Sequence, residues 1–227
     1  MLLQNRYLTR TLRIRHAHGP ASAIMICLNG VGYLVTARHA VAGIQADENI
    51  QFRVDDGWDT ISVGRLKLAD HDDIAVLTSP QLGNLGLEQE FISPDIFVGQ
   101  AVAYCGFPLG LEGSGPPDHR WPIPLVKSAI YSGSIHRDGQ VIFLFDTLNN
   151  KGFSGGPIFA ADNAGTPKLV AIVSGYHFDR PVPVMRPTER GDLESIPDLV
   201  VQPNSGFMKG VPIARALELI AELEHGC

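Results

Sequence analysis

The sequence predicts an all-β protein that ends in one helix. Short runs of β-branched and apolar residues recur along the chain, and Gly, Pro, Asn and Asp separate them, which is typical of barrel strands. The expected strands lie at 23–28, 33–36, 50–54, 74–77, 100–105, 141–146, 156–159 and 169–174. The helix is expected over 212–224, because apolar residues recur there at helical spacing after Pro212.

A joint rich in Gly and polar residues over 81–94 divides the chain into two parts. We place the boundary after residue 90, so that 1–90 form an N-terminal barrel and 91–227 form a C-terminal barrel with the closing helix. A chain of 227 residues with 44% hydrophobic residues is long enough to bury the core of one compact unit or two small subdomains. We expect a functional site in the cleft between the two parts.

Composition excludes several classes of function. The net charge is −6, and no basic run with interleaved aromatic residues occurs, so we expect no nucleic-acid partner. No apolar run approaches the roughly 18 residues that a membrane-spanning helix needs, so we expect no membrane span. The scattered histidines show no metal-ligand spacing, and we expect neither a metal nor a cofactor.

Cysteine usage and the N-terminal segment indicate a cytoplasmic location. Cys27, Cys105 and Cys227 form no even-numbered disulfide framework. Residues 1–20 lack the apolar core of a secretory signal. We expect reduced thiols, although the sequence leaves a single bridge between Cys27 and Cys105 open.

The run KGFSGGP at 151–157 is the strongest functional signal in the chain. It sets Ser154 among small residues, where its hydroxyl can be exposed as a nucleophile. Gly152 allows a substrate carbonyl to approach the backbone, and the N–H groups of Gly152 and Ser154 can converge on one oxyanion. The alternative interpretation is a glycine turn with an incidental serine.

Two upstream segments supply the partners that a serine nucleophile needs. The run GYLVTARHAV at 32–41 leads an apolar strand into a tight turn that carries His39, and DDIAVL at 72–77 places acids at the head of another buried strand. Histidine has the pKa suited to take a proton from a serine hydroxyl and return it. An aspartate on the other ring nitrogen fixes the tautomer and stabilises the imidazolium.

These blocks and their order, His then Asp then Ser, resemble the trypsin-like (chymotrypsin-fold) serine peptidases. The runs YCGFPLGL at 104–111 and NSGFMKGVPI at 204–213 look like segments of the bacterial Deg/Htr-type protease domain, here without a PDZ domain. The resemblance implies two six-stranded antiparallel β-barrels, an acyl-enzyme mechanism and a polypeptide substrate. It implies His39, Asp73 and Ser154 as the catalytic residues, with Gly152, Phe153 and Ser154 forming the oxyanion hole.

The choice between Asp72 and Asp73 rests on two arguments. Adjacent side chains of a strand point to opposite faces, so only one of the two acids can face His39. In the family that this chain resembles, the acid directly precedes the apolar strand, and we therefore expect Asp73 to be the partner.

The resemblance also implies where substrate specificity arises. The walls of the pocket are expected from Leu148 and Asn149, ahead of the nucleophile glycine, and from Ser174, Gly175 and Tyr176. Leu148 falls where trypsin has an aspartate, and an apolar wall cannot pair with Lys or Arg. We expect a preference for small or medium apolar side chains on the substrate residue before the cut. The alternative is that Leu148 and Tyr176 are core residues.

The family's secreted members carry an aspartate just before the nucleophile, which pairs with a new N-terminus after cleavage of a precursor. This chain has Phe153 there, so activation by N-terminal cleavage is not expected.

Two other functions and two long loops stay open at this stage. The run GFSGG also fits the G-x-S-x-G motif of α/β-hydrolase esterases, although Gly155, Gly156 and Pro157 oppose the helix which that fold needs after the serine. A protease-fold binding module without activity is the third possibility. We expect 112–124 to be a surface loop that flanks the cleft, and 177–203 to be a long loop that gates access to it.

Overall fold

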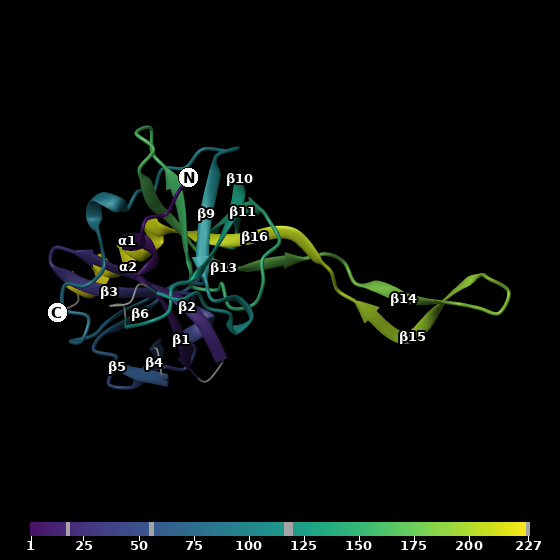
Figure 1. Ribbon diagram of the computed structural model, residues 1–227, viewed down its shortest axis with the longest axis horizontal. Coiled ribbons are helices and arrows are strands. Elements are labelled where there is room, and N and C mark those ends of the chain that lie inside the picture. Colours follow the sequence, from purple (N-terminus) through teal and green to yellow (C-terminus); the bar gives the residue numbers. More distant parts are fainter. Residues whose placement is uncertain (17–18, 55–56, 116–119, 226–227) are drawn as a thin grey trace.

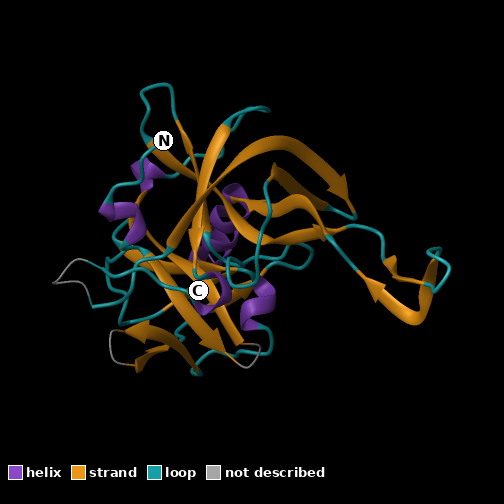
Figure 2. Cartoon of the chain, turned by 45° about the vertical axis from the view of Figure 1, so that its right-hand side comes forward, coloured by secondary structure: helices purple, strands orange, loops and turns teal. Residues whose placement is uncertain are grey.

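The computed structural model describes residues 1–16, 19–54, 57–115 and 120–225 (Figure 1). Two antiparallel sheets make up most of it, and the C-terminal helix α2 (Ile213–His225) packs against strands of both (Figures 1 and 2). The expected all-β class with a closing helix is therefore confirmed.

The first sheet contains eight strands in the order β5-β4-β1-β2-β3-β7-β6, with β8 beside β2. Their bounds are β1 Thr11–His16, β2 Gly19–Leu28, β3 Val31–Thr36, β4 Asn49–Val54, β5 Gly57–Ser62, β6 Leu66–Leu68, β7 Ala75–Thr78 and β8 Leu87–Glu88. All pairs are antiparallel except β2 with β8. Short helices α1 (Asn5–Leu8), η1 (Arg38–Val41) and η2 (Gln89–Phe91) accompany this sheet.

The second sheet is a closed six-stranded barrel in the order β10-β11-β16-β13-β12-β9. Its strands are β9 Ala101–Gly106, β10 Leu125–Arg137, β11 Gln140–Asp146, β12 Pro157–Ala161, β13 Pro167–Phe178 and β16 Asn204–Pro212. A one-turn helix, η3 (Pro108–Gly110), follows β9. The strand directly after Ser154 is β12 rather than a helix, and every pair of the barrel is antiparallel. The α/β-hydrolase alternative is therefore wrong.

The segment between β13 and β16 forms a two-stranded ribbon, β14 (Val182–Pro187) with β15 (Leu193–Val201). This ribbon projects away from the body of the molecule in both views (Figures 1 and 2). The long loop expected over 177–203 is therefore largely this paired ribbon, and its two strands extend away from the body of the molecule.

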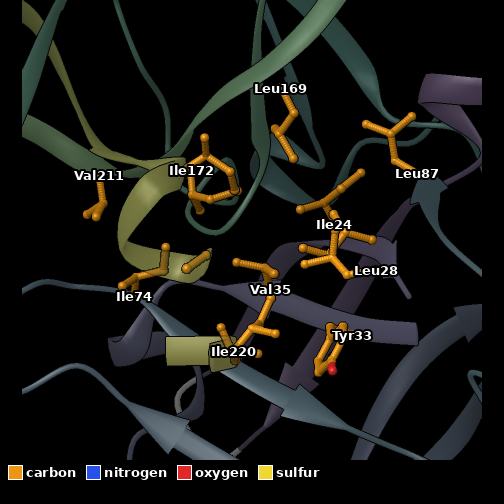
Figure 3. Close-up of a cluster of buried hydrophobic side chains, with 14 of the residues drawn as sticks. Ile24, Leu28, Tyr33, Val35, Ile74, Leu87, Leu169, Ile172, Val211 and Ile220 are labelled. Atoms are coloured by element: carbon orange, nitrogen blue, oxygen red, sulfur yellow. The ribbon is translucent and has the colours of Figure 1, made fainter. Parts of the chain in front are cut away.

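One buried cluster joins the two sheets and α2 (Figure 3). Ile24 and Val35 come from the first sheet, Leu169 and Ile172 from the barrel, and Ile220 from the helix; all are 2% exposed or less. Burying an aliphatic side chain of this size contributes about 1.5–3 kcal/mol. The shared core fixes the orientation of the two halves and hence of the loops between them.

The proposed boundary after residue 90 falls within η2, between the last strand of the first sheet and the first strand of the barrel. We keep it as a proposal.

The loop expected over 112–124 packs on the first sheet. Glu112 accepts hydrogen bonds from Arg13 (2.8 Å) and Arg53 (3.3 Å), and the Trp121 indole N–H donates to the carbonyl of Thr9 (3.1 Å). Part of this expected loop, 116–119, lies outside the described residues.

Two further observations bear on the expectations from composition. Cys27 and Cys105 are both free thiols, and Cys227 lies outside the described residues. Of the helices in the described part of the chain, none has the length and apolar character to cross a membrane.

Candidate active site

His39 and Asp73 meet where two loops of the first sheet converge. Strand β3 ends at Thr36, and the chain turns into η1, which carries His39. His39 Nδ1 lies 2.7 Å from Asp73 Oδ2, and the backbone N–H of His39 donates to Asp73 Oδ1 at 2.9 Å. The carboxylate therefore accepts from both the ring and the backbone, which fixes the ring and leaves Nε2 free to accept a proton.

Asp72 points away from His39, although both acids lie in a bend before β7 (Ala75–Thr78) and not in the strand from which this was expected. Its side chain is 1% exposed, and its Oδ2 accepts a hydrogen bond from Arg215 of α2 at 2.6 Å. The second oxygen, Oδ1, is buried and has no partner among the described residues. The two adjacent acids thus have separate roles: Asp73 contacts His39, and Asp72 holds the closing helix.

The surroundings of His39 raise its pKa above the ordinary value of 6.5. The hydrogen bond to Asp73 is the largest cause, and the negative charge of Asp73 adds to it. Partial burial and the positive charge of Lys209 act in the opposite direction. A raised pKa makes His39 a stronger base for a proton from a nearby hydroxyl.

Ser154 and His39 line the same cleft, which has a volume of about 310 Å³. The other lining residues are Gly19, Pro20, Ala21, Ala40, Asn150, Lys151, Gly152 and Tyr176. Within the described residues, no hydrogen bond joins the Ser154 hydroxyl to the His39 ring. Such contacts between reacting groups are often long without substrate and tighten in the complex.

Hydrogen bonds fix most of the backbone of residues 150–156, here called the oxyanion loop. The N–H of Leu109 donates to the Lys151 carbonyl (2.9 Å), and the N–H of Gly156 donates to the Phe153 carbonyl (2.8 Å). In a trans peptide the C=O and N–H point in opposite directions, so the N–H groups of Gly152 and Ser154 point away from these contacts. Neither N–H has a hydrogen-bond partner among the described residues. Both are therefore free to donate to another acceptor.

Gly152 is required by this geometry. Its φ is +104°, a conformation that side chains oppose, and a Cβ on it would lie 2.3 Å from the Phe107 carbonyl oxygen. The loop therefore turns through a position that no other residue type fits.

Ser22 anchors the same loop from β2 of the first sheet and is fully buried. Its hydroxyl accepts from the Phe107 N–H (3.1 Å) and donates to the Gly152 carbonyl (2.8 Å), and its N–H donates to the Ser154 carbonyl (2.8 Å). Because the Phe107 N–H occupies an acceptor position, the hydroxyl proton is directed at Gly152. The sequence reasoning missed Ser22, although a polar residue in the apolar run ASAIMI was a usable signal.

Phe153 is fully buried and packs edge-on against Tyr104, with ring centroids 4.8 Å apart. Its N–H is directed to the Asn150 carbonyl at 3.4 Å, so the two N–H groups left for an oxyanion are those of Gly152 and Ser154. Apolar packing of Phe153 therefore helps to hold the loop in this chain.

Of the five residues expected to form the specificity pocket, only Tyr176 is among the described residues that line the cleft. Asn149 is 3% exposed and donates from Nδ2 to the Gly175 carbonyl at 3.1 Å, which ties the oxyanion loop to β13. Leu148 is 61% exposed, and none of Leu148, Ser174 and Gly175 is among the described residues that line the cleft.

No group of His, Cys, Asp or Glu side chains within the described parts of the chain has the arrangement of a metal site. What the site contains is a base with its orienting acid, a serine in the same cleft and two free backbone donors.

Comparisons with known proteins concern the family and the fold of the chain. The family model of the trypsin-like peptidase domain matches residues 22–172. A search of curated protein sequences finds no match.

Several solved structures share the fold. The HtrA-type protease AlgW, solved with a tripeptide, is similar with a TM-score of 0.62 and 22% identity over 98% of this chain and 62% of its own. The Rv3671c protease of M. tuberculosis H37Rv, in an inactive form, has a TM-score of 0.61 and 15% identity over 96% of this chain and 90% of its own. The MamO protease domain of Magnetospirillum magneticum has a TM-score of 0.57 and 16% identity over 95% and 98%. The chain thus spans less than two thirds of AlgW, and these distant likenesses concern the fold alone.

Proposed function

The chain belongs to the trypsin-like peptidase family, and we propose that it is a serine endopeptidase that hydrolyses peptide bonds through an acyl-enzyme. Ser154 is the nucleophile, His39 is the general base and acid, and Asp73 orients His39. The single observation that carries the proposal is the double contact of Asp73 with His39 beside a cleft that Ser154 also lines.

In the first step, Ser154 Oγ forms a bond to the substrate carbonyl carbon while His39 Nε2 takes the hydroxyl proton. The π electrons of the carbonyl move onto its oxygen, and the N–H groups of Gly152 and Ser154 stabilise the resulting oxyanion. Collapse of this intermediate breaks the C–N bond, and His39 returns the proton to the leaving amine.

In the second step, a water molecule replaces the amine. His39 takes one of its protons, and the oxygen attacks the ester carbon of the acyl-enzyme. A second oxyanion forms in the same place. Its collapse breaks the ester C–O bond and releases the acid product, while His39 returns the proton to Ser154 Oγ. Asp73 stays ionised throughout and stabilises the imidazolium that forms in each step.

We keep the preference for a small or medium apolar substrate residue before the cut as part of the proposal. Two observations support it. No carboxylate stands among the described residues that line the cleft, so a substrate Lys or Arg has no partner there. Lys151 lies at the edge of the cleft and repels a basic side chain.

The partner that the family implies is a polypeptide substrate.

A cytoplasmic location remains a proposal, which the free thiols of Cys27 and Cys105 support. Fractionation of the source cells tests it, and recovery of the protein outside the cytoplasm would refute it.

The second candidate is a latent binding module. The observation that favours it is the missing hydrogen bond between Ser154 and His39 among the described residues. Covalent labelling separates the two functions. A fluorophosphonate reacts with an activated serine, so label that maps to Ser154 supports the peptidase, and a folded protein without label supports the latent module.

A further inference from the structure

Two lysines place uncompensated positive charge beside the cleft. Lys151 lines the cleft with an exposed side chain, and Lys209 lies on β16 opposite Gly175 of β13. In the part of the chain that the structure describes, neither ammonium group has an ion pair or a hydrogen bond. The chain carries a net charge of −6, so these two cations do not belong to a generally positive surface.

The path of the Lys209 side chain is set by the absence of a side chain at Gly175. A Cβ at that position would lie 3.9 Å from the Cε atom of Lys209. The lysine stem therefore lies over the open face of Gly175, whose neighbour Tyr176 lines the cleft together with His39. The electrostatic effect of Lys209 on His39, opposite in sign to that of Asp73, agrees with this placement.

The same strand decides which substrate residue meets Lys209. Strand β12 pairs with β13 only as far as Ile172, and beyond Val173 the edge on that side has no strand partner within the described residues. An extended substrate can add to this edge, with its side chains alternating between two faces. Gly175 and Tyr176 are on opposite faces of β13.

The substrate residue that supplies the scissile carbonyl lies at Ser154. In the arrangement proposed next, the residue before it turns its side chain to the face of Gly175 over which the Lys209 stem lies.

We propose that Lys209 selects substrates that carry Asp or Glu immediately before the residue that is cleaved. This inference rests on the proposed peptidase function. The substrate carboxylate pairs with the Lys209 ammonium group at the rim of the cleft. It also cancels the repulsion that Lys209 exerts on the His39 imidazolium formed during attack. A neutral side chain at this position leaves Lys209 uncompensated, and a basic one adds to the repulsion.

Peptidyl phosphonate probes test the proposal directly. In a matched set, valine supplies the phosphonate that mimics the scissile carbonyl, and the residue before it is Glu, Gln or Lys. The second-order rate of Ser154 labelling is measured for each probe. We expect the Glu probe to react about fivefold faster than the isosteric Gln probe at low salt, as for a partly exposed ion pair. The Lys probe should be the slowest, and the differences should shrink as salt is added.

Variants assign the effect to Lys209. Lys209→Met keeps the apolar stem over Gly175 and removes the charge, so the Glu to Gln rate ratio should fall to about one. Lys209→Arg should keep most of the ratio. The matched control is Lys67→Met, since Lys67 pairs with Glu222 at 2.7 Å on α2; the ratio should not change there.

A small alkyl fluorophosphonate carries no amino-acid residue that could reach Lys209. It therefore tests the proposed peptidase function separately from the role of Lys209. If it fails to label the folded wild type, the proposed function is wrong. If it labels Ser154 but the Glu and Gln probes react equally fast, or neither reacts, the role of Lys209 is wrong while the function stands. A Glu preference that survives in Lys209→Met would also overturn the inference.

Discussion

Gly152→Ala is the substitution whose effect follows most directly from the geometry of the oxyanion loop. The added Cβ would lie 2.3 Å from the Phe107 carbonyl oxygen, and real Cβ contacts are essentially never under 3.0 Å. The loop must therefore shift by at least 0.7 Å, the difference between 3.0 and 2.3 Å. A shift of this size removes the Gly152 N–H from the oxyanion. Loss of one such donor costs about 10²–10³ in kcat, or roughly 2.7–4 kcal/mol.

The assay compares kcat and KM of wild type and variant on one cleaved peptide, with thermal unfolding followed in parallel. Gly165→Ala is the matched control, because Gly165 also has a positive φ of +80° but a Cβ there meets nothing within 4 Å. Both variants bear a backbone strain of about 1–2 kcal/mol, so both should lower Tm, and only Gly152→Ala should lower kcat. Activity of Gly152→Ala within a fewfold of wild type would refute the assignment of the oxyanion donors.

Three further predictions concern residues around the site. Ser22→Ala should lower kcat about tenfold with little change in KM, since it removes a buried hydrogen bond to the oxyanion loop; an equal rise in KM would contradict this. The raised pKa of His39 should place the acid limb of kcat/KM above pH 6.5, and Lys209→Met should move it higher still because it removes a positive charge; a limb at lower pH would be inconsistent. Arg215→Met leaves the carboxylate of Asp72 buried and unpaired, so unfolding in urea should show a loss of about 3 kcal/mol, and a loss below about 1 kcal/mol would mean that the pair is not structural.

The same pKa shift has a consequence for stability. A group whose pKa is raised in the folded state adds stability below its unfolded pKa, and this stability is lost as pH rises through the folded value. The contact of His39 with Asp73 therefore stabilises the fold most under mildly acidic conditions, where the imidazole is protonated. Activity and this contribution to stability change in opposite directions with pH, because catalysis needs the neutral ring.

Strands that form continuous apolar runs could be predicted from the sequence, because such runs are typical of buried strands. Expected strands at 23–28, 33–36 and 141–146 fall within β2, β3 and β11. Strand β10 was missed, since its burial pattern alternates between half-buried and exposed residues over much of its length. The ribbon of β14 and β15 was missed for a related reason: nearly all of its residues are exposed, so no core imposes a pattern.

In the candidate site, the resemblance predicted Asp73 over Asp72, because the family's acid directly precedes the apolar strand. The argument from strand alternation did not apply, since both acids lie in a bend before β7 begins at Ala75. The supports of the oxyanion loop could not be predicted. Ser22 and Leu109 act through contacts with residues 130 and about 40 positions away. Lys209 depends on its cross-strand register with Gly175. These relations exist only after the barrel has closed and, for Ser22, after the two sheets have packed together.

The most direct test of the central claim is covalent labelling of the folded chain by a fluorophosphonate, beside Ser154→Ala and His39→Ala, with mass mapping of the labelled peptide. The account predicts label on Ser154 in wild type and none in either variant, because the nucleophile needs its own hydroxyl and the His39 base. Label that persists in His39→Ala at the wild-type rate, or its absence from folded wild type, would contradict the claim that His39 and Ser154 form one catalytic site.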